Sequence, residues 1–266
     1  MQVVFITGGS TGIGKATGVL LQSLGYYVVG TSRSPDRYAN HPFSLLEMDL
    51  HDIASIQKAI KEVVSKYGCI DVVVNNAGKG IAGPIEETPL SEIQEVFETN
   101  FIGPVAVIQS VLPIMRKQQR GKIINITSIA GYAGLPFRGI YSATKSSLHM
   151  ITESLRLELK NTNIQCCSLA PGDVATNISQ GRYHVPINEK SPYKAIYGSA
   201  RREMDEHVAD GVSAQSVATR IHQLILKNNL KPHYTVGPWI QRFSVYLKSY
   251  LPNMGYEFLL TKFYKL

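Results

Sequence analysis

A tyrosine and a lysine four residues apart, Tyr141 and Lys145, are candidates for acid–base chemistry in this chain. At that spacing two side chains lie on one face of a helix. A tyrosine hydroxyl ordinarily has a pKa of about 10, and a nearby ammonium group lowers the pKa of a phenol. Such a pair can move a proton to or from a carbonyl or alcohol oxygen. The alternative is an ordinary pair on a helix surface.

A third candidate, Ser128, lies thirteen residues before Tyr141 and follows the apolar run 121–127. The run predicts a strand, and open α/β sheets hold their sites at the ends of the strands. A serine hydroxyl at that edge would add a hydrogen-bond donor to the tyrosine and the lysine. The alternative is a loop serine, so the surrounding elements decide.

The composition is that of an ordinary globular protein. The chain has 266 residues, 44% hydrophobic and 18% charged, enough for one large α/β domain or two small ones. No apolar run approaches the roughly 18 residues that span a membrane. The first strand-like run, 2–6, meets a glycine turn directly, so a cytoplasmic location is expected. Cys69, Cys166 and Cys167 have no zinc-like spacing and are expected to be reduced.

The net charge of +7 is compatible with several anionic partners. The Lys and Arg residues are scattered, with no run of five or more and no nucleic-acid motif. The charge therefore favours a basic surface and an anionic cofactor over nucleic-acid binding.

The N-terminal segment predicts a strand, a glycine turn, a helix and a second strand. Glycines allow a tight turn and a close approach to a pyrophosphate, and the N–H groups of the next helix can bind its charge. This βαβ unit predicts dinucleotide binding, with an ordinary turn as the alternative. The turn reads Gly8-Gly9-Ser10-Thr11-Gly12-Ile13-Gly14.

The end of the second strand predicts which cofactor binds. An acid at this place accepts hydrogen bonds from the ribose of NAD, whereas an arginine accommodates the 2′-phosphate of NADP. The chain has Ser32 and Arg33 there and no acid before Asp36. NADP(H) is therefore favoured over NAD(H), with a solvated loop arginine as the alternative.

Later strand ends add polar and small residues to the same edge of the sheet. Asp49, followed by Leu50, ends the third strand, where its carboxylate could accept from an adenine amino group. The fourth strand ends in Asn75-Asn76-Ala77-Gly78, which allows a close backbone approach. The sixth ends at Pro171-Gly172.

One long helix is expected from a capping residue, Ser91, to Lys117, with a kink at Gly103-Pro104. Asn100 lies inside this helix, where asparagine is unfavourable. Beside a kink it is expected to hydrogen-bond a buried group rather than to lie on the surface.

Strands and helices alternate, which predicts one Rossmann-type α/β domain over residues 1–266. Its doubly wound parallel sheet would have about seven strands with helices on both faces. The expected strands are 3–7, 27–31, 44–48, 70–74, 122–127, 163–170 and 233–236. The other expected helices are 16–24, 53–67, 141–160, 199–209 and 213–227.

Two C-terminal segments depart from this pattern. Residues 173–210 include a polar stretch without clear periodicity, which is typical of a lid over a substrate site. Residues 239–266 are aromatic and basic, and they are expected to dock near the site or on a second subunit. The alternative is an amphipathic segment on a membrane surface, although Pro252 and Gly255 break it into short pieces.

Together the motifs resemble the short-chain dehydrogenase/reductase family. The resemblance implies an oxidoreductase that acts on CH–OH groups of a small molecule and is commonly a dimer or tetramer. The tail has a weaker resemblance to the branch with 17β-hydroxysteroid and retinol dehydrogenases, which implies a lipophilic alcohol or ketone. The matching residues, in the family's order over about 1–176, are Thr7-Gly8-x3-Gly12-Ile13-Gly14, Asp49, Asn75-Asn76-Ala77-Gly78, Asn100, Ser128, Tyr141-x3-Lys145 and Pro171-Gly172.

The resemblance also implies the roles of the site residues. Tyr141 would be the general acid in reduction and the base in oxidation, and Lys145 would favour its ionised form and bind the nicotinamide ribose. Ser128 would hydrogen-bond the substrate oxygen, and Asn100 would hold a water that continues the proton relay past Lys145. No metal is expected. The other implied cofactor contacts are Gly8, Ser10, Thr11, Gly12, Ile13, Gly14, Ser32, Arg33, Asp49, Leu50, Asn76, Ala77, Gly78, Pro171, Gly172, Val174 and Thr176.

A cofactor-binding regulator or scaffold without catalysis is the alternative function. Such proteins typically lose the tyrosine or the lysine, and both are present here. The sequence therefore favours NADP(H)-dependent interconversion of a hydroxyl and a carbonyl group, with reduction of a ketone or aldehyde preferred.

Overall fold

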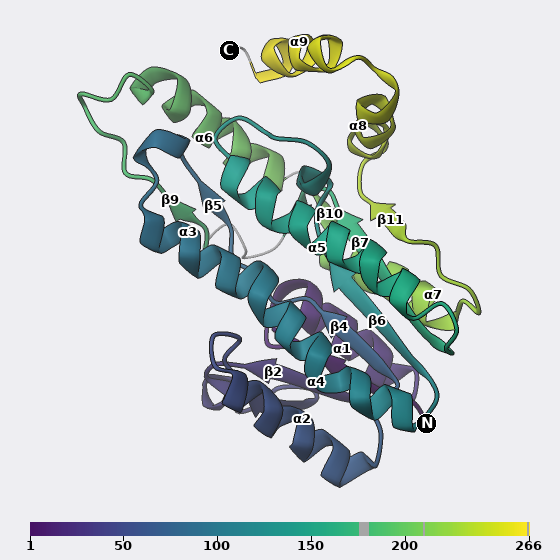
Figure 1. Ribbon diagram of the computed structural model, residues 1–266. Coiled ribbons are helices and arrows are strands. Elements are labelled where there is room, and N and C mark those ends of the chain that lie inside the picture. Colours follow the sequence, from purple (N-terminus) through teal and green to yellow (C-terminus); the bar gives the residue numbers. More distant parts are fainter. Residues whose placement is uncertain (176–180, 210, 265) are drawn as a thin grey trace.

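The computed structural model describes residues 1–175, 181–209, 211–264 and 266. Its centre is a seven-stranded sheet in the order β11-β7-β6-β4-β1-β2-β3 (Figure 1), and each neighbouring pair is parallel. The chain builds the sheet outward from β1 in one direction and then from β4 in the other, which makes the sheet doubly wound. The strands are β1 (Val3–Ile6), β2 (Tyr27–Ser32), β3 (Ser44–Glu47), β4 (Val72–Asn75), β6 (Gly121–Ile126), β7 (Ile164–Pro171) and β11 (His233–Val236).

The central strands bury both of their faces. Along β1, Val3 and Phe5 pack in one apolar cluster, whereas Val4 and Ile6 pack in the other. Successive side chains of a strand point to opposite faces, so a strand covered on both sides needs apolar residues at every position. This explains the continuous apolar run at the N-terminus.

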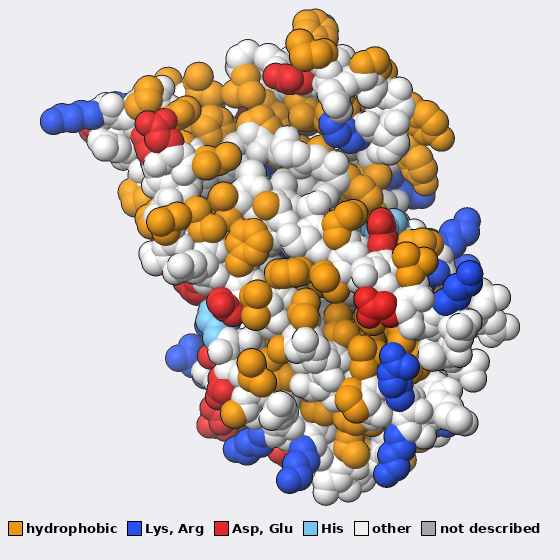
Figure 2. All heavy atoms as spheres, in the orientation of Figure 1, with side chains coloured by type: hydrophobic (Ala, Val, Ile, Leu, Met, Phe, Trp, Pro, Cys, Tyr) orange, Lys and Arg blue, Asp and Glu red, His pale blue; other side chains and the backbone are white. Residues whose placement is uncertain are grey.

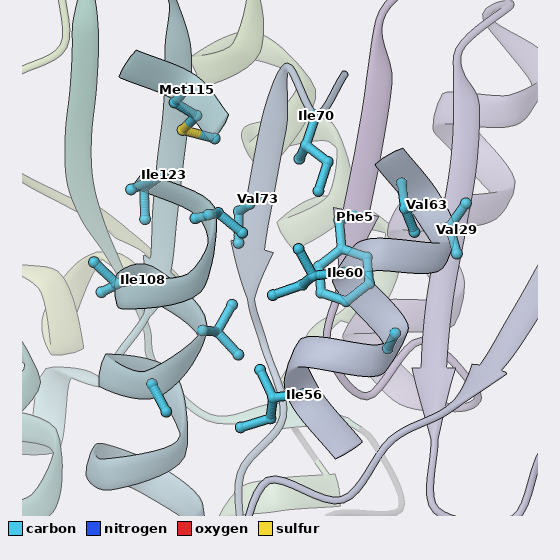
Figure 3. Close-up of a cluster of buried hydrophobic side chains, with 14 of the residues drawn as sticks. Phe5, Val29, Ile56, Ile60, Val63, Ile70, Val73, Ile108, Met115 and Ile123 are labelled. Atoms are coloured by element: carbon cyan, nitrogen blue, oxygen red, sulfur yellow. The ribbon is translucent and has the colours of Figure 1, made fainter. Parts of the chain in front are cut away.

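Helices cover both faces of the sheet (Figure 1). Residues of α2, α4 and α5 join the cluster on one face, and residues of α1 and α7 join the cluster on the other. Figure 3 shows the first cluster, in which Ile56 and Ile60 of α2 lie against Phe5 and Val73 of the sheet. The helices are α1 (Gly12–Ser23), α2 (Ile53–Tyr67), α3 (Leu90–Phe97), α4 (Gly103–Lys117), α5 (Gly139–Glu158), α6 (Lys194–Ala209), α7 (Ala214–Leu226), α8 (Trp239–Tyr250) and α9 (Asn253–Tyr264).

The predicted fold class, a seven-stranded parallel sheet with helices on both faces, is confirmed. The fourth strand begins at Val72 rather than Ile70. The Gln118 side chain hydrogen-bonds both the N–H (3.3 Å) and the carbonyl (2.7 Å) of Ile70, so that residue is outside the ladder. Helix α6 begins earlier than expected, at Lys194.

The predicted long helix is present but differs in two details. It begins at Leu90 with Pro89 as its N-cap, so the prediction that Ser91 caps it is wrong. Its irregularity is a π-helical turn, η3 (Glu98–Ile102), immediately before the expected kink at Gly103-Pro104. The helix then continues as α4.

The helical run Leu90–Lys117 is long and apolar enough to cross a membrane, judged by length and composition alone. The sequence predicted no such segment because polar and charged residues interrupt the apolar positions between 90 and 117. Within this run Val107, Val111 and Met115 are fully buried against the sheet. The run therefore serves as a core helix in this fold.

Two pairs of short strands stand beside the main sheet, and both pairs are parallel. The Tyr197 hydroxyl of α6 donates to the Ala82 carbonyl at 2.9 Å, which attaches α6 to one of these pairs. The described parts of the predicted lid, 173–210, are thus held by strand pairing and packing, and residues 176–180 and 210 lie outside the described residues. The pairs are β5 (Ile81–Ala82) with β9 (Tyr183–His184), and β8 (Val174–Ala175) with β10 (Val212–Ser213).

The C-terminal helices α8 and α9 follow β11 and lie outside the layers around the sheet (Figure 1). Figure 2 shows orange hydrophobic side chains over this part of the molecule, at its upper right. No residue of α8 is buried, and Tyr256 is the buried residue of α9.

Candidate active site

The predicted motifs meet at the carboxyl edge of the sheet, where a cavity of about 590 Å³ lies. Residues that follow β1, β2, β3, β4, β6 and β7 line it, together with the start of α5. The cavity spans the point where the strand order reverses, between β1 and β4, as open doubly wound sheets place their ligands. Parallel strands end at one edge, so distant motifs converge there.

Tyr141 and Lys145 lie on one face of α5 and both line the cavity. The Lys145 Nζ is 5.9 Å from the centre of the Tyr141 ring and donates to the Ile126 carbonyl at 3.1 Å. Burial lowers the pKa of Lys145, and the nearby Tyr141 partly offsets this. The lysine side chain is thus held in a fixed position beside the tyrosine and is almost completely shielded from solvent.

Ser128 stands directly after β6 and caps the short helix η4 (Ile129–Tyr132). Its Oγ accepts from the Ala130 N–H at 3.2 Å, so the hydroxyl proton remains available to donate. Ser128 lines the same cavity as Tyr141. Two hydroxyl groups and one lysine amino group therefore share the site.

Asn100 is fully buried in the π-helical turn η3 and does not line the cavity. Its Oδ1 accepts from the Lys79 N–H at 2.8 Å, and its Nδ2 donates to the Lys79 carbonyl at 2.9 Å and to Thr144 Oγ1 at 3.1 Å. The side chain therefore joins the segment after β4 to the helix of Tyr141. The expectation that it hydrogen-bonds buried groups is confirmed.

The glycine turn has a backbone that needs glycine. Gly8 and Gly12 have φ values of +65° and +53°, which other residues rarely adopt. A Cβ on Gly14 would lie 2.2 Å from the Gly8 carbonyl oxygen, so Gly14 allows the turn to pack on α1. Gly14 itself does not line the cavity.

The turn is also tied to the end of β4. Thr7 Oγ1 accepts from the N–H groups of Asn76 and Ala77, each at 3.0 Å. The Asn76 amide donates to the carbonyls of Thr7 at 2.9 Å and Gly8 at 3.1 Å. These bonds hold the two central strand ends at a fixed separation.

Other predicted contacts also line the cavity: Ser10, Thr11, Ile13, Ser32, Arg33, Asp49, Leu50, Gly78, Pro171, Gly172 and Val174. One Asp49 carboxylate oxygen accepts from the His51 N–H at 3.0 Å. Thr176 is a predicted contact outside the described residues.

Sequence reasoning missed several basic residues of the cavity. Arg37, in the short helix η1 (Pro35–Tyr38), lines it one turn after Arg33. Arg138 lines it beside Tyr141, with its guanidinium 5.6 Å from the ring centre. Lys79 also lines it and pairs with Glu95 at 2.8 Å. The sequence could have indicated Arg138, since it lies three residues before Tyr141 and so close to it at the start of the same helix.

A polar chain that the sequence did not predict runs from the buried His149 and Ser168, behind Ser128, to the surface at His233 and Glu153. His149 and His233 both approach Ser168 Oγ, at 3.0 and 2.6 Å, and His233 Nε2 lies 2.6 Å from a Glu153 carboxylate oxygen. His149 Nε2 lies 3.5 Å from the Ser128 carbonyl oxygen. Burial, followed by the neighbouring His233, lowers the pKa of His149 to about 4.

The site fits a nicotinamide dinucleotide. The positive φ of Gly8 and Gly12 opens the turn beneath α1. The N-cap of α1, Thr11, makes no side-chain cap, so the first N–H groups of the helix remain available for a pyrophosphate. Among the described residues, no group of three or more His, Cys, Asp or Glu side chains could hold a metal ion.

Known proteins share both the sequence and the fold. The short chain dehydrogenase family matches residues 2–185. A 3-ketodihydrosphingosine reductase of Bacteroides thetaiotaomicron is 33% identical over 264 residues, which cover 99% of this chain and 98% of the relative. A probable short-chain type dehydrogenase/reductase of Helicobacter pylori is 31% identical over 96% of this chain and 94% of its own.

Solved structures agree with the fold. A short-chain dehydrogenase from Streptomyces avermitilis has a TM-score of 0.83 at 26% identity and covers 93% of each chain. A short chain dehydrogenase/reductase from Burkholderia phymatum in complex with NAD has a TM-score of 0.76 at 27% identity, over 88% of each chain. ElxO with NADP bound has a TM-score of 0.70 at 26% identity, over 88% of this chain and 96% of that one.

The fold and the site define an α/β oxidoreductase with a nicotinamide dinucleotide as cofactor. The chain belongs to the short-chain dehydrogenase/reductase family and acts on CH–OH groups or the corresponding carbonyls. The family expected from the sequence motifs is therefore confirmed.

Proposed function

We propose that this protein uses NADPH to reduce a ketone or aldehyde on a lipophilic substrate, with Tyr141 as the general acid. The observation that carries the proposal is the convergence of Tyr141, Ser128 and Lys145 on one cavity, next to the glycine turn. In the reverse direction Tyr141 is the general base.

Each side chain has one task in this proposal. The cofactor, when bound, supplies the hydride to the carbonyl carbon. The Tyr141 hydroxyl donates a proton to the carbonyl oxygen, while the Ser128 hydroxyl donates a hydrogen bond to the same oxygen and orients it. Lys145 in its protonated form stabilises the negative charge that develops on Tyr141, and that charge in turn favours the protonated lysine. Asn100 holds Lys79 and Thr144, and through them the wall around the lysine.

The test of the mechanism is Tyr141→Phe, with NADPH oxidation measured on ketones and aldehydes of graded chain length. We expect kcat to fall about 10²- to 10⁴-fold, while NADPH binding, followed by its fluorescence, persists. Tyr132→Phe is the matched control because Tyr132 lies outside the cavity lining. A fully active Tyr141→Phe variant contradicts the mechanism. Cofactor binding without turnover on any substrate favours a regulator or scaffold instead.

The preference for NADP(H) rests on the end of β2. Ser32, Arg33 and Arg37 line this end of the cavity, and no acid stands between Gly30 and Ser34. A guanidinium group binds a phosphate with charge-assisted hydrogen bonds. The preference for NADPH is measured as kcat/KM with NADPH divided by kcat/KM with NADH. We expect Arg33→Asp to lower this preference by about tenfold or more. Arg202→Asp, an exposed position on α6, is the control. An unchanged ratio contradicts the assignment.

The lipophilic substrate is supported by the name of the Bacteroides relative, a 3-ketodihydrosphingosine reductase. The exposed aromatic helices beside the cavity agree with such a substrate. In the same panel, kcat/KM is expected to rise with chain length. A preference for the shortest ketones contradicts this part of the proposal.

A further inference from the structure

The outward face of α8 is aromatic. Trp239, Phe243, Tyr246 and Tyr250 recur at steps of four, three and four residues, so they lie along one side of the helix. Their exposed fractions are 72%, 53%, 59% and 84%. A helix that packs on its own domain ordinarily turns such a face inward. This helix turns it to the outside.

Helix α9 extends the apolar surface with Phe258 and Phe263, which are 68% and 58% exposed. We call the six side chains of α8 and α9 the outer aromatic face: Trp239, Phe243, Tyr246, Tyr250, Phe258 and Phe263. Figure 2 shows hydrophobic side chains over this part of the molecule. Large exposed aromatic side chains gathered on neighbouring helices mark an interaction site.

The opposite side of α8 is attached to the cavity wall. Gln241 Oε1 accepts from the Asp173 N–H at 3.0 Å, and Gln241 Nε2 donates to the Asp173 carboxylate at 2.7 Å. Asp173 and the preceding Gly172 line the cavity. The side of α8 opposite the outer aromatic face therefore contacts the wall of the active-site cavity.

Charge decides between two possible occupants of this face. The exposed basic side chains of α8 and α9 are Arg242 and Lys262, against one acid, Glu257, whereas Lys248 lies over the buried Tyr256 ring. In a two-fold contact with a second copy, the same basic surface would meet itself. An anionic lipid surface is complementary to it, and Trp, Tyr and Phe rings are favoured at the membrane–water interface.

We propose that the outer aromatic face binds an anionic membrane surface, with α8 lying in the interface and the cavity directly behind it. A lipophilic substrate would then pass from the lipid to the site without crossing bulk water. This delivery step rests on the proposed function, whereas membrane binding does not, so the two can fail separately.

The only tryptophan of the chain, Trp239, lies on this face and reports on it directly. We expect its fluorescence to shift to shorter wavelength when the full chain is mixed with vesicles of phosphatidylcholine and phosphatidylserine. We also expect the protein to co-sediment with these vesicles. Absence of both signals overturns the proposal.

The double variant Phe243→Ser/Tyr246→Ser removes two rings from the face and keeps Trp239 as the probe. We expect the apparent affinity for the vesicles to fall about tenfold or more. Leu157→Ser/Leu226→Ser is the matched control, since these leucines are 75% and 63% exposed on α5 and α7. Equal loss in both double variants, or no loss in either, overturns the proposal.

The exposed cations Arg242 and Lys262 test the lipid charge. Arg242→Gln/Lys262→Gln is expected to weaken binding to the anionic vesicles and to leave the weaker binding to pure phosphatidylcholine unchanged. Sedimentation without lipid tests the other occupant. If Phe243→Ser/Tyr246→Ser converts an oligomer to a monomer and the wild type does not bind vesicles, the face is an interface between copies and the proposal is wrong.

Activity separates this proposal from the proposed function. The Phe243→Ser/Tyr246→Ser variant is expected to reduce a short, water-soluble ketone at the wild-type rate and a vesicle-borne ketone more slowly. A wild type that reduces neither ketone contradicts the proposed function but leaves vesicle binding to be judged on its own measurement.

Discussion

Helices α5 and α8 both reverse the usual distribution of side chains, in opposite directions. Helix α5 buries polar and charged residues: Ser142, Thr144, Lys145, His149 and Thr152, all at most 5% exposed. Helix α8 exposes aromatic residues: Trp239, Phe243, Tyr246 and Tyr250, all at least 53% exposed. Both helices lie close to η4 beside the cavity.

The two helices differ in whether these unusual side chains contribute to the stability of the fold. A buried polar group has a free-energy cost unless it is hydrogen-bonded, and Thr144, Lys145, His149 and Thr152 all have such partners within the fold. An exposed aromatic ring contributes little to the packing of the core, so the fold does not depend on it. We infer that substitutions of the buried, hydrogen-bonded polar residues of α5 change the stability of the protein, whereas substitutions on the outer side of α8 change what it binds.

The largest expected effect concerns His149, whose pKa in the folded protein is lowered to about 4 by burial. The groups around it are His233, the ring of Tyr132 and, as a nearby charge, Lys145, while Glu153 faces His233. The unfolded chain takes up a proton near pH 6.5 and the folded protein does not. Stability therefore falls as the pH drops from about 6.5 to 4, by about 3 kcal/mol at most.

Urea unfolding at pH 7 and pH 5 measures this effect. Between these values His149→Asn is expected to lose about 2 kcal/mol less stability than the wild type, because it has no group to protonate. Thr152→Val keeps His149 and should keep the wild-type slope. Parallel slopes for His149→Asn and the wild type would falsify the prediction.

The next effect concerns Thr152, whose hydroxyl accepts from Asn125 Nδ2 at 2.9 Å and donates to the Leu148 carbonyl at 2.7 Å. Thr152→Val keeps the shape but leaves the buried Asn125 amide with one acceptor fewer. We expect a loss of about 1–3 kcal/mol in the free energy of unfolding at pH 7. Ser154→Ala, at an exposed position of the same helix, should change it by less than about 0.5 kcal/mol. Equal losses of stability in Thr152→Val and Ser154→Ala would contradict the expected difference between buried and exposed positions of α5.

The smallest effect is expected on the outer side of α8. Phe243→Ser should change the free energy of unfolding by less than about 0.5 kcal/mol, because the ring is half exposed and lies on the outer side. Gln241→Leu, on the inner side, loses both hydrogen bonds to Asp173 and should cost about 1–2 kcal/mol. Thermal and urea unfolding measure both. A larger loss for Phe243→Ser would mean that the aromatic side is part of the folded core or of a subunit interface.

Much of the site could be predicted because its signals are local. The glycine turn, Ser128 after an apolar run and the spacing of Tyr141 and Lys145 each lie within a few residues of a strand end or on one helix turn. The parallel sheet then brings these strand ends together without any further information. The same rule could not place Arg37, which reaches the cavity from the short helix η1, or Arg138, which precedes α5 and does not follow a strand.

The histidine pair His149 and His233 was not predictable in the same way. His149 lies one helical turn after Lys145, which was a usable signal, but its partner His233 is 84 residues away on the edge strand β11. The π-helical turn at Glu98–Ile102 was expected only as a kink near Gly103. Each of these features depends on packing between elements that the sequence pattern describes one at a time.

The sequence by itself determined the doubly wound sheet, the dinucleotide turn and the Tyr141/Lys145 pair, because residue periodicity and spacing specify strands, turns and helix faces directly. Only the tertiary structure decided that the aromatic side of α8 faces outward and that His149 meets His233. The physical reason is that an amphipathic pattern identifies which side of a helix is apolar, but not what lies against that side.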